Sequence, residues 1–410
     1  MKKSQGLSTF FASCPREMET MLDQELDQFG IEDREVKKGG VRFKADDLTG
    51  IQFLIHTRLA SRVFKSFAFM KVRNEKDLYN KAKTEPWLKA LTLNQTFKIQ
   101  TLFDHKSKAF FKNSVAVSQI LKDAIVDHFR EKKGERPSVD TKDADVNFLL
   151  RIEGGRGDKG WNCSVFIDLC GSPLSNRGYR QRGHSAPIRE NLAAALVIAS
   201  EFDGEEDVFY DPMCGSGTIL IEAILIKGKI PPTYLRILRN IERKEKTFAF
   251  LEQVWFKEKT FLTRDVKEYL QQTYEQINKS IDELEHFQFY GSDIQARNLN
   301  LCREHLENAG LPADIVELEK GDATKLTLEI EAPGVVVTNP PYGERLGATD
   351  EVKELYYNLG ENLKNNYKGF RAFILTSNPE LRKKIALQTA KRIPFFNGNI
   401  ECRLLRYDIR

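Results

Sequence analysis

Long apolar segments are absent from this chain of 410 residues. Nowhere do about eighteen apolar residues run together, which is the length that a membrane-spanning helix needs. Lys2 and Lys3 stand near the amino terminus, but no apolar core of the kind found in a signal peptide follows them. We therefore expect a soluble, cytoplasmic protein that makes no contact with a membrane.

Cysteine is scarce, and its spacing is irregular. The six cysteines are Cys14, Cys163, Cys170, Cys214, Cys302 and Cys402. They do not form the paired spacing of a metal site, so we expect no bound metal. Scattered single cysteines are typical of reduced thiols in the cytosol.

Neither sign of charge is in large excess, because 63 lysines and arginines face 59 acidic residues and give a net charge of +4. Nucleic-acid binding would therefore have to come from local basic patches rather than from the chain as a whole. The length predicts more than one domain. The oligomeric state cannot be inferred from composition.

The most informative stretch is Thr338-Asn339-Pro340-Pro341-Tyr342-Gly343, which follows the apolar run Val335-Val336-Val337. Three β-branched residues before a pair of prolines predict a buried parallel strand that ends abruptly. Ligands bind at the carboxyl ends of such strands. The amide oxygen of Asn339 suits an exocyclic amine, and Tyr342 suits stacking on a planar ring. The alternative is an ordinary turn, since the same residue types favour turns.

A second stretch, Tyr210 to Thr218, joins a short apolar strand to the apolar helix predicted over Ile219 to Ile226. Two glycines at a strand-to-helix turn allow close approach of a ligand. No Gly-Lys-Ser/Thr follows, and the third glycine of a dinucleotide fingerprint is missing. An Asp-x-x-x-Gly-x-Gly turn suits a cationic ligand without phosphate. Asp293 and Asp322 follow two further predicted strands, where a carboxylate suits ribose hydroxyls, although each alone would be a solvated cap.

Four sites, taken in chain order, resemble the S-adenosylmethionine-dependent class I methyltransferases over roughly residues 185 to 410. They are the turn from Tyr210 to Thr218, Asp293, Asp322 and the stretch from Asn339 to Tyr342. Asn-Pro-Pro-Tyr resembles the subgroup that methylates exocyclic nitrogens of adenine or guanine. The resemblance implies an α/β, Rossmann-like sheet with a terminal antiparallel hairpin, which Asn397-Gly398-Asn399 favours as a tight turn. It also implies S-adenosyl-L-methionine as the cofactor, with Asp293 on its ribose and Asp322 on its adenine amine.

The upstream elements resemble two α+β modules. The order of elements in residues 1–70 resembles a ferredoxin-like unit, and that in residues 71–170 resembles the THUMP domain of RNA-modifying enzymes. A basic connector is predicted over 171–189, followed by the methyltransferase domain over 190–410. Within that domain, a helical insertion is expected over about 228–286, as a cover for the cofactor site or a wall of an RNA groove.

Two groups of basic residues are candidates for RNA contact. Lys106, Lys108 and Lys112 lie beside Phe110 and Phe111 and would contact phosphates, unless they form only a solvated face. In the connector, arginine forks interleaved with an aromatic ring suit single-stranded RNA, although a flexible linker has similar composition. The connector candidates are Arg177, Tyr179, Arg180 and Arg182.

The connector indicates which subgroup of methyltransferases the chain resembles. Arg-Gly-Tyr-Arg, followed by Ala186 to Leu196, resembles the THUMP-bearing guanine-N2 methyltransferases, in which this segment helps to close the cofactor pocket. Glu190 and Asn191 are accordingly placed near the cofactor. The resemblance implies cofactor-binding residues Asp211, Pro212, Cys214, Gly215, Gly217, Thr218, Asp293, Asp322, Asn191 and Asn339, and catalytic residues Asn339, Pro340, Pro341 and Tyr342.

Residues 339–346 resemble most the large-subunit rRNA enzymes of the RlmL type, with Glu344 and Arg345 as the pair that differs from tRNA enzymes. We therefore expect methylation of the N2 amine of a guanine in RNA, most simply 23S rRNA. The alternatives are a tRNA guanine-N2 enzyme, an adenine-N6 enzyme, a protein-glutamine methyltransferase and a non-catalytic RNA-binding protein. The fused RlmL-type enzymes continue into a second methyltransferase at the position where this chain ends, so we expect a second methyltransferase activity to be absent.

Overall fold

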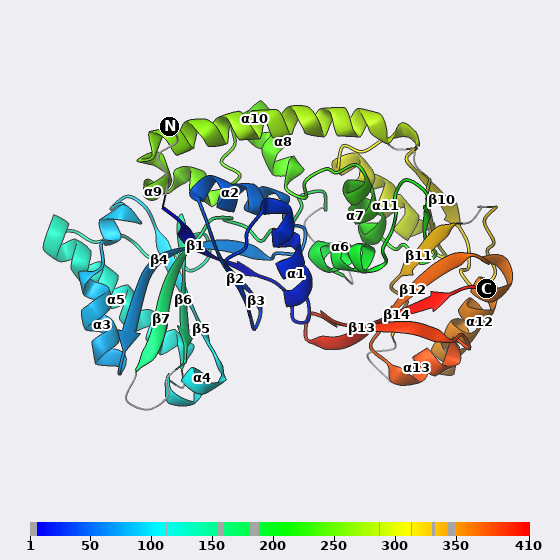
Figure 1. Ribbon diagram of the computed structural model, residues 1–410, viewed down its shortest axis with the longest axis horizontal. Coiled ribbons are helices and arrows are strands. Elements are labelled where there is room, and N and C mark those ends of the chain that lie inside the picture. Colours follow the sequence, from blue (N-terminus) through cyan, green and yellow to red (C-terminus); the bar gives the residue numbers. More distant parts are fainter. Residues whose placement is uncertain are drawn as a thin grey trace.

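The computed structural model describes residues 6–111, 113–154, 160–180, 188–286, 288–312, 314–329, 333–342 and 349–410. Lys112, Arg182, Glu344 and Arg345 lie outside these ranges. The protein has two halves, each built on a seven-stranded sheet (Figure 1). Within the described ranges, no helix combines the length and the apolar character that crossing a membrane requires.

The sheet of the amino-terminal half runs in the order β2-β3-β1-β4-β7-β6-β5. Its strands are β1 (Ser8–Ser13), β2 (Arg34–Lys37), β3 (Gly40–Ala45), β4 (Arg62–Val72), β5 (Phe97–Phe103), β6 (Val146–Glu153) and β7 (Trp161–Asp168). With α1 (Glu19–Glu25) and α2 (Asp47–His56), the first four strands give the ferredoxin-like order that was predicted. Strand β4 pairs with both β1 and β7, so the ferredoxin-like and THUMP-like segments share one continuous sheet.

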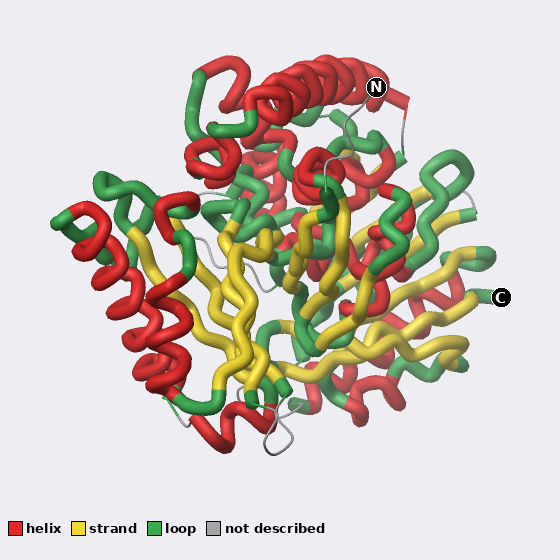
Figure 2. The backbone as a smooth tube through the Cα atoms, turned by 60° about the vertical axis from the view of Figure 1, so that its left-hand side comes forward, coloured by secondary structure: helices red, strands yellow, loops and turns green. Residues whose placement is uncertain are grey.

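Helices α3 (Glu75–Thr84) and α5 (Ser114–Lys133) cover one face of this sheet, and α4 (His105–Phe111) lies at its lower end (Figures 1 and 2). The predicted apolar stripe of α5 is buried at Val117, Leu121 and Ile125. Asn113 caps the start of α5 by accepting hydrogen bonds from backbone N–H groups. The predicted antiparallel hairpin is formed by β6 and β7.

The carboxyl-terminal sheet runs in the order β10-β9-β8-β11-β12-β14-β13. Its strands are β8 (Val208–Asp211), β9 (Phe289–Asp293), β10 (Val316–Lys320), β11 (Gly334–Thr338), β12 (Phe370–Thr376), β13 (Thr389–Asn397) and β14 (Ile400–Asp408). The first five in this order are parallel, and β14 is antiparallel to both of its neighbours. The Rossmann-like sheet with a terminal hairpin is thereby confirmed.

The helices of this half connect and cover these strands. They are α6 (Glu190–Ala199), α7 (Thr218–Lys227), α11 (Ala296–Asn308), α12 (Asp350–Asn366) and α13 (Pro379–Lys384). In Figure 1, β14 ends at the carboxyl terminus on the right, and β12 runs antiparallel to it. The carboxyl ends of the parallel strands, where ligands bind in such sheets, therefore point toward the amino-terminal half.

The insertion contains α8 (Tyr234–Arg243), α9 (Val254–Lys257) and α10 (Thr260–Asp282). Helix α10 lies across the top of both halves and packs against α2 and α8 (Figure 1). Short 3₁₀ segments occur at η1 (Leu26–Phe29), η2 (Trp87–Lys89), η4 (Ala249–Glu252) and η5 (Glu283–His286). The predicted insertion therefore braces the two halves.

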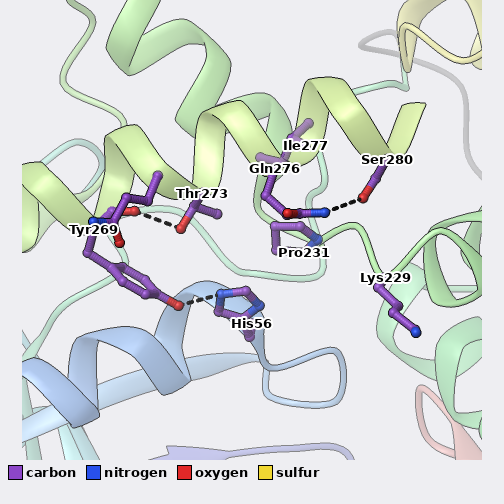
Figure 3. Close-up of a pocket in the computed structure, with 9 residues that line it drawn as sticks. His56, Lys229, Pro231, Tyr269, Thr273, Gln276, Ile277 and Ser280 are labelled. Atoms are coloured by element: carbon purple, nitrogen blue, oxygen red, sulfur yellow. Dashed lines mark hydrogen bonds between the residues drawn. The ribbon is translucent and has the colours of Figure 1, made fainter. Parts of the chain in front are cut away.

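A cavity of about 310 Å³ lies at this brace, between α2 and α10 (Figure 3). His56 Nε2 lies 2.7 Å from the hydroxyl oxygen of Tyr269 across the joint. Burial, assisted by the charge of Arg58, lowers the pKa of His56 to about 4, so the imidazole is neutral at pH 7. The lining includes neither the glycine turn nor residues 339–342, so this cavity belongs to the joint between the halves.

Apolar packing also joins the halves. One hydrophobic cluster runs from Phe10 and Leu22 in the amino-terminal half to Ile224 and Val337 in the carboxyl-terminal half. Arg58 crosses the same boundary by donating to the backbone carbonyls of Leu225 at 3.0 Å and Ile230 at 2.8 Å. The two halves therefore share a core.

Candidate active site

The turn between β8 and α7 depends on two glycines in the left-handed region. Gly215 has a φ of 54° and Gly217 a φ of 78°. A Cβ atom on Gly217 would lie 2.3 Å from Sγ of Cys302, so only glycine fits there. A Cβ atom on Gly215 would meet no atom within 4 Å. The turn is therefore packed tightly on its Gly217 side and open at Gly215, as a ligand cradle requires.

Asp293, at the end of β9, is tied to this turn. Its Oδ2 accepts a hydrogen bond from the Gly215 N–H at 3.1 Å. Its Oδ1 accepts from the Gln295 N–H at 2.8 Å and from Nδ2 of Asn298 at 3.1 Å. An ionised carboxylate has about four acceptor positions, so capacity for a ligand hydroxyl is left over.

Asp211 ends β8 and is buried. Its Oδ1 accepts from the Met213 N–H at 3.1 Å. Burial raises the pKa of Asp211 to about 7 and the charge of Asp293 adds to this shift, although the hydrogen bond from the Met213 N–H opposes it. A cationic ligand group beside Asp211 would stabilise its ionised form.

Asp322 follows β10 and lies next to Asp293 in the sheet, since the Gly321 N–H donates to the Asp293 carbonyl at 3.2 Å. Partial burial alone would raise the pKa of Asp322. Hydrogen bonds from the Thr324 N–H at 2.9 Å and hydroxyl at 2.7 Å outweigh burial and hold that pKa below its usual range. Asp322 is therefore a fixed, ionised acceptor beside Asp293.

Asn339 follows β11, which lies between β8 and β12. It is half-buried; Pro340 is buried, Pro341 is exposed, and Tyr342 is only 8% exposed. The Tyr342 hydroxyl donates a hydrogen bond to Oδ1 of Asn339. Sequence reasoning placed both residues at one site but missed this bond. An amide oxygen has two lone pairs, so Oδ1 of Asn339 can accept one further hydrogen bond.

His305 and Arg180 support the glycine turn from outside it. Nδ1 of His305, on α11, lies 3.0 Å from the Ser216 carbonyl oxygen. Arg180 donates through Nη2 to the Thr218 hydroxyl at 2.6 Å, and its Nε lies 3.4 Å from Oε1 of Glu190. Sequence reasoning missed His305 and assigned Arg180 to RNA, because long-range partners of this kind leave no mark in local spacing.

Two connector residues have internal roles in place of the predicted RNA contacts. Arg177 and Tyr179 are each 1% exposed, and Nε of Arg177 lies 3.0 Å from Oε1 of the buried Glu222. These side chains are thus not available to RNA in this structure. The alternative of a flexible linker is also wrong for this part of the connector, because both side chains are buried.

Asn191 does not reach toward the turn. Its Nδ2 donates to the Leu59 carbonyl at 3.3 Å and to the Ser61 hydroxyl at 3.2 Å, so the amide faces the amino-terminal half. Lys106 and Lys108 are exposed on α4, as RNA contact would require. Lys112 and Arg182 lie outside the described residues. In the part of the chain that the structure describes, no three His, Cys, Asp or Glu side chains gather as a metal site would need.

Comparison with known proteins shows the family to which the chain belongs. Residues 177–406 match the RMKL-like methyltransferase domain, residues 72–156 the THUMP domain and residues 9–64 the RlmL ferredoxin-like domain. Ribosomal RNA large subunit methyltransferase K/L of Allochromatium vinosum is 34% identical over 404 residues, which are 98% of this chain and 51% of that protein. The chain thus spans about half the length of the curated relatives that it matches.

Two solved structures resemble the whole chain. One is a protein described as a methyltransferase, complexed with SAH, which is 27% identical with a TM-score of 0.80 over 100% of this chain and 99% of that one. Another is a predicted N6-adenine-specific DNA methylase from Listeria monocytogenes, which is 26% identical with a TM-score of 0.79 over 99% of this chain and 97% of that one. On the match over residues 177–406, the chain belongs to the RMKL-like methyltransferase domain family.

Proposed function

We propose that this protein transfers a methyl group from S-adenosyl-L-methionine to the exocyclic N2 amine of a guanine in large-subunit ribosomal RNA. The observation that carries the proposal is the convergence of Asp293, the Gly215 N–H and Asn339 at the ends of neighbouring strands. The curated relative named above acts, by its name, on large-subunit ribosomal RNA. The solved relative holds SAH, which is the product left when S-adenosyl-L-methionine gives up its methyl group.

The residues present fit the cofactor. The open turn from Asp211 to Gly217 would hold the methionine portion, whose positive charge suits the buried Asp211 carboxylate. Asp293 would accept from the ribose hydroxyls and Asp322 from the adenine amine. When bound, the cofactor supplies an electrophilic methyl group on a sulfonium.

Asn339 would orient the target amine. A base is taken out of its stack and seated against the Tyr342 ring, as enzymes that act on base atoms require. Oδ1 of Asn339 and the carbonyl of Pro340 would accept hydrogen bonds from the amine and turn its lone pair toward the methyl group. The Tyr342 hydroxyl already occupies one lone pair of Oδ1, which fixes the amide before the base arrives.

The division of the chain follows the same proposal. Residues 1–70 and 71–170 would hold the RNA, with Lys106 and Lys108 contacting phosphates. Residues 190–410 would carry the chemistry, and the connector 171–189 would join the two. The carboxyl edge of the parallel strands points toward the amino-terminal half, which suits an RNA bound to both.

Cofactor placement is tested by calorimetry on full-length protein. Asp293→Ala should weaken binding of S-adenosyl-L-methionine clearly, because a ribose acceptor and a support of the Gly215 N–H are both lost. Asp350→Ala is the matched control, since that side chain is 99% exposed at the start of α12. Equal affinities for the two variants would contradict the placement.

Substrate choice is tested with methyl-labelled cofactor and protein-free RNA. Label should enter large-subunit rRNA in preference to tRNA and duplex DNA. The alternative is methylation of the N6 amine of adenine, which is the activity named for the Listeria relative. Label in adenine, or in DNA, would support that alternative and overturn the proposal.

A further inference from the structure

A half-exposed aromatic ring stands on α4. Phe110 is 50% exposed, although phenylalanine is usually buried. Its ring packs on Trp161, with centroids 5.2 Å apart, and on Phe111, with centroids 4.9 Å apart. Phe111 packs in turn against Phe103 at 5.9 Å. Because the rings of Trp161 and Phe111 pack against Phe110, the Phe110 side chain is already restricted in its rotamers. A ligand that stacks on this ring would therefore cost little further side-chain entropy.

Two lysines lie on the same short helix as this ring. Lys106 and Lys108 are exposed on the same helix, whose sequence contains no acidic residue. The nearby Asp104 is engaged in capping: its Oδ1 accepts from the Ser107 N–H at 2.7 Å, and its Oδ2 accepts from the Gly154 N–H at 2.9 Å. The described surface of α4 therefore combines a supported ring with two exposed lysines.

We propose that Phe110, supported by Trp161, is a stacking platform for an unpaired base of the RNA substrate, with Lys106 and Lys108 on the flanking phosphates. The proposal rests on the proposed function, because it takes RNA as the substrate. Stacking needs only the face of a ring and tolerates any base, while lysines supply charge complementary to the backbone. The platform would anchor RNA away from the reacting base.

The test uses full-length protein, a labelled single-stranded oligoadenylate and an RNA duplex of the same length, with affinity measured by fluorescence anisotropy. Phe110→Leu should weaken single-strand binding roughly tenfold or more, since an aliphatic side chain packs but does not stack. Phe110→Tyr, which keeps the ring, should bind as the wild type does. Duplex affinity should not change in either variant, because paired bases are already stacked.

A matched control and a spectroscopic signal complete the experiment. Phe261→Leu changes a phenylalanine that is 70% exposed on α10 and should leave single-strand affinity unchanged. Single-stranded RNA should quench tryptophan emission, and Trp161→Phe should remove most of this quenching. The double variant Lys106→Ala, Lys108→Ala should lower the slope of log affinity against log salt by about 2.

Equal single-strand affinity in Phe110→Leu and the wild type would overturn the platform, as would equal losses in Phe110→Leu and Phe110→Tyr. Failure of the proposed function looks different. A wild-type protein that shows ring-dependent RNA binding, yet transfers no methyl group to rRNA with cofactor present, refutes the proposed activity and keeps the platform.

Discussion

Asn339 is the residue on which the proposed chemical step depends most. Asn339→Ala should lower the single-turnover rate by about 10² to 10³, because one well-placed polar partner of the reacting amine is lost. RNA and cofactor affinities should stay near wild type, since the interaction is needed mainly in the transition state. Single-turnover methyl transfer, with separately measured affinities, checks both statements. An Asn339→Ala enzyme that transfers at the wild-type rate would refute this active site.

Tyr342 separates two contributions at the same position. Tyr342→Phe keeps the ring and removes the hydrogen bond to Asn339, so it should lower the rate with little effect on RNA affinity. Tyr342→Ala removes the ring as well and should weaken base capture by about 1 to 3 kcal/mol. Comparing RNA affinities of the two variants checks this. Equal affinities would exclude Tyr342 as a stacking partner.

The raised pKa of Asp211 predicts that cofactor binding depends on pH. Its pKa is raised to about 7 in the free protein, so its ionised fraction falls as the pH drops below that value. Affinity for the cationic cofactor should fall with it, approaching about tenfold per pH unit well below the pKa. Calorimetry between pH 5 and 7 measures this, and Asp211→Asn should flatten the profile. The same pH dependence in Asp211→Asn would assign it to another group.

A buried ion pair joins the connector to α7. Both side chains of Arg177 and Glu222 are fully buried, with Nε and Oε1 3.0 Å apart. Glu222→Gln should lower the free energy of unfolding by about 3 to 5 kcal/mol, because an uncompensated buried cation remains. Arg177→Met combined with Glu222→Leu should recover most of this loss in urea unfolding. A double variant as unstable as the single one would contradict this account.

Helix α10 is attached to α2 by a contact that acid should weaken. The unfolded state takes up a proton on His56 near its ordinary pKa of 6.5, whereas the folded state does so only near 4. Folding stability from this group is therefore complete above pH 6.5 and falls as the pH drops toward 4. The loss by pH 5 should be about 2 kcal/mol. His56→Gln should remove this component from urea unfolding at pH 5 and 7, whereas His105→Gln, at an exposed position, should retain it.

Features of this protein that depend on local sequence could be predicted, and features that depend on long-range partners could not. The strand Val335–Val337, the requirement for Gly217 and the final hairpin followed from local patterns, because β-branching, left-handed backbone and turn chemistry are local properties. The buried role of Arg177 did not, because its partner Glu222 lies on a helix distant in sequence. The bond between Tyr342 and Asn339 was missed for a different reason, since spacing does not fix rotamers.

The shared core also changes how the molecule should be tested. One apolar cluster includes Leu22 of the amino-terminal half and Ile224 of the carboxyl-terminal half, so cutting the chain between them would expose apolar surface on both pieces. The division of labour between RNA binding and chemistry is therefore tested best by substitutions in the full chain. Lys106 and Lys108 should affect RNA affinity alone, and Asp293 cofactor affinity alone.

Methylation of the guanine N2 amine in large-subunit rRNA is the activity that we propose for this protein. Mass spectrometry of nucleosides from a deletion strain, complemented with the wild type or with Asn339→Ala, measures this activity in the cell. We predict that N2-methylguanosine in 23S rRNA falls on deletion, returns with the wild type and does not return with Asn339→Ala. Unchanged N2-methylguanosine, or a loss of N6-methyladenosine or of a tRNA modification in its place, would contradict this account.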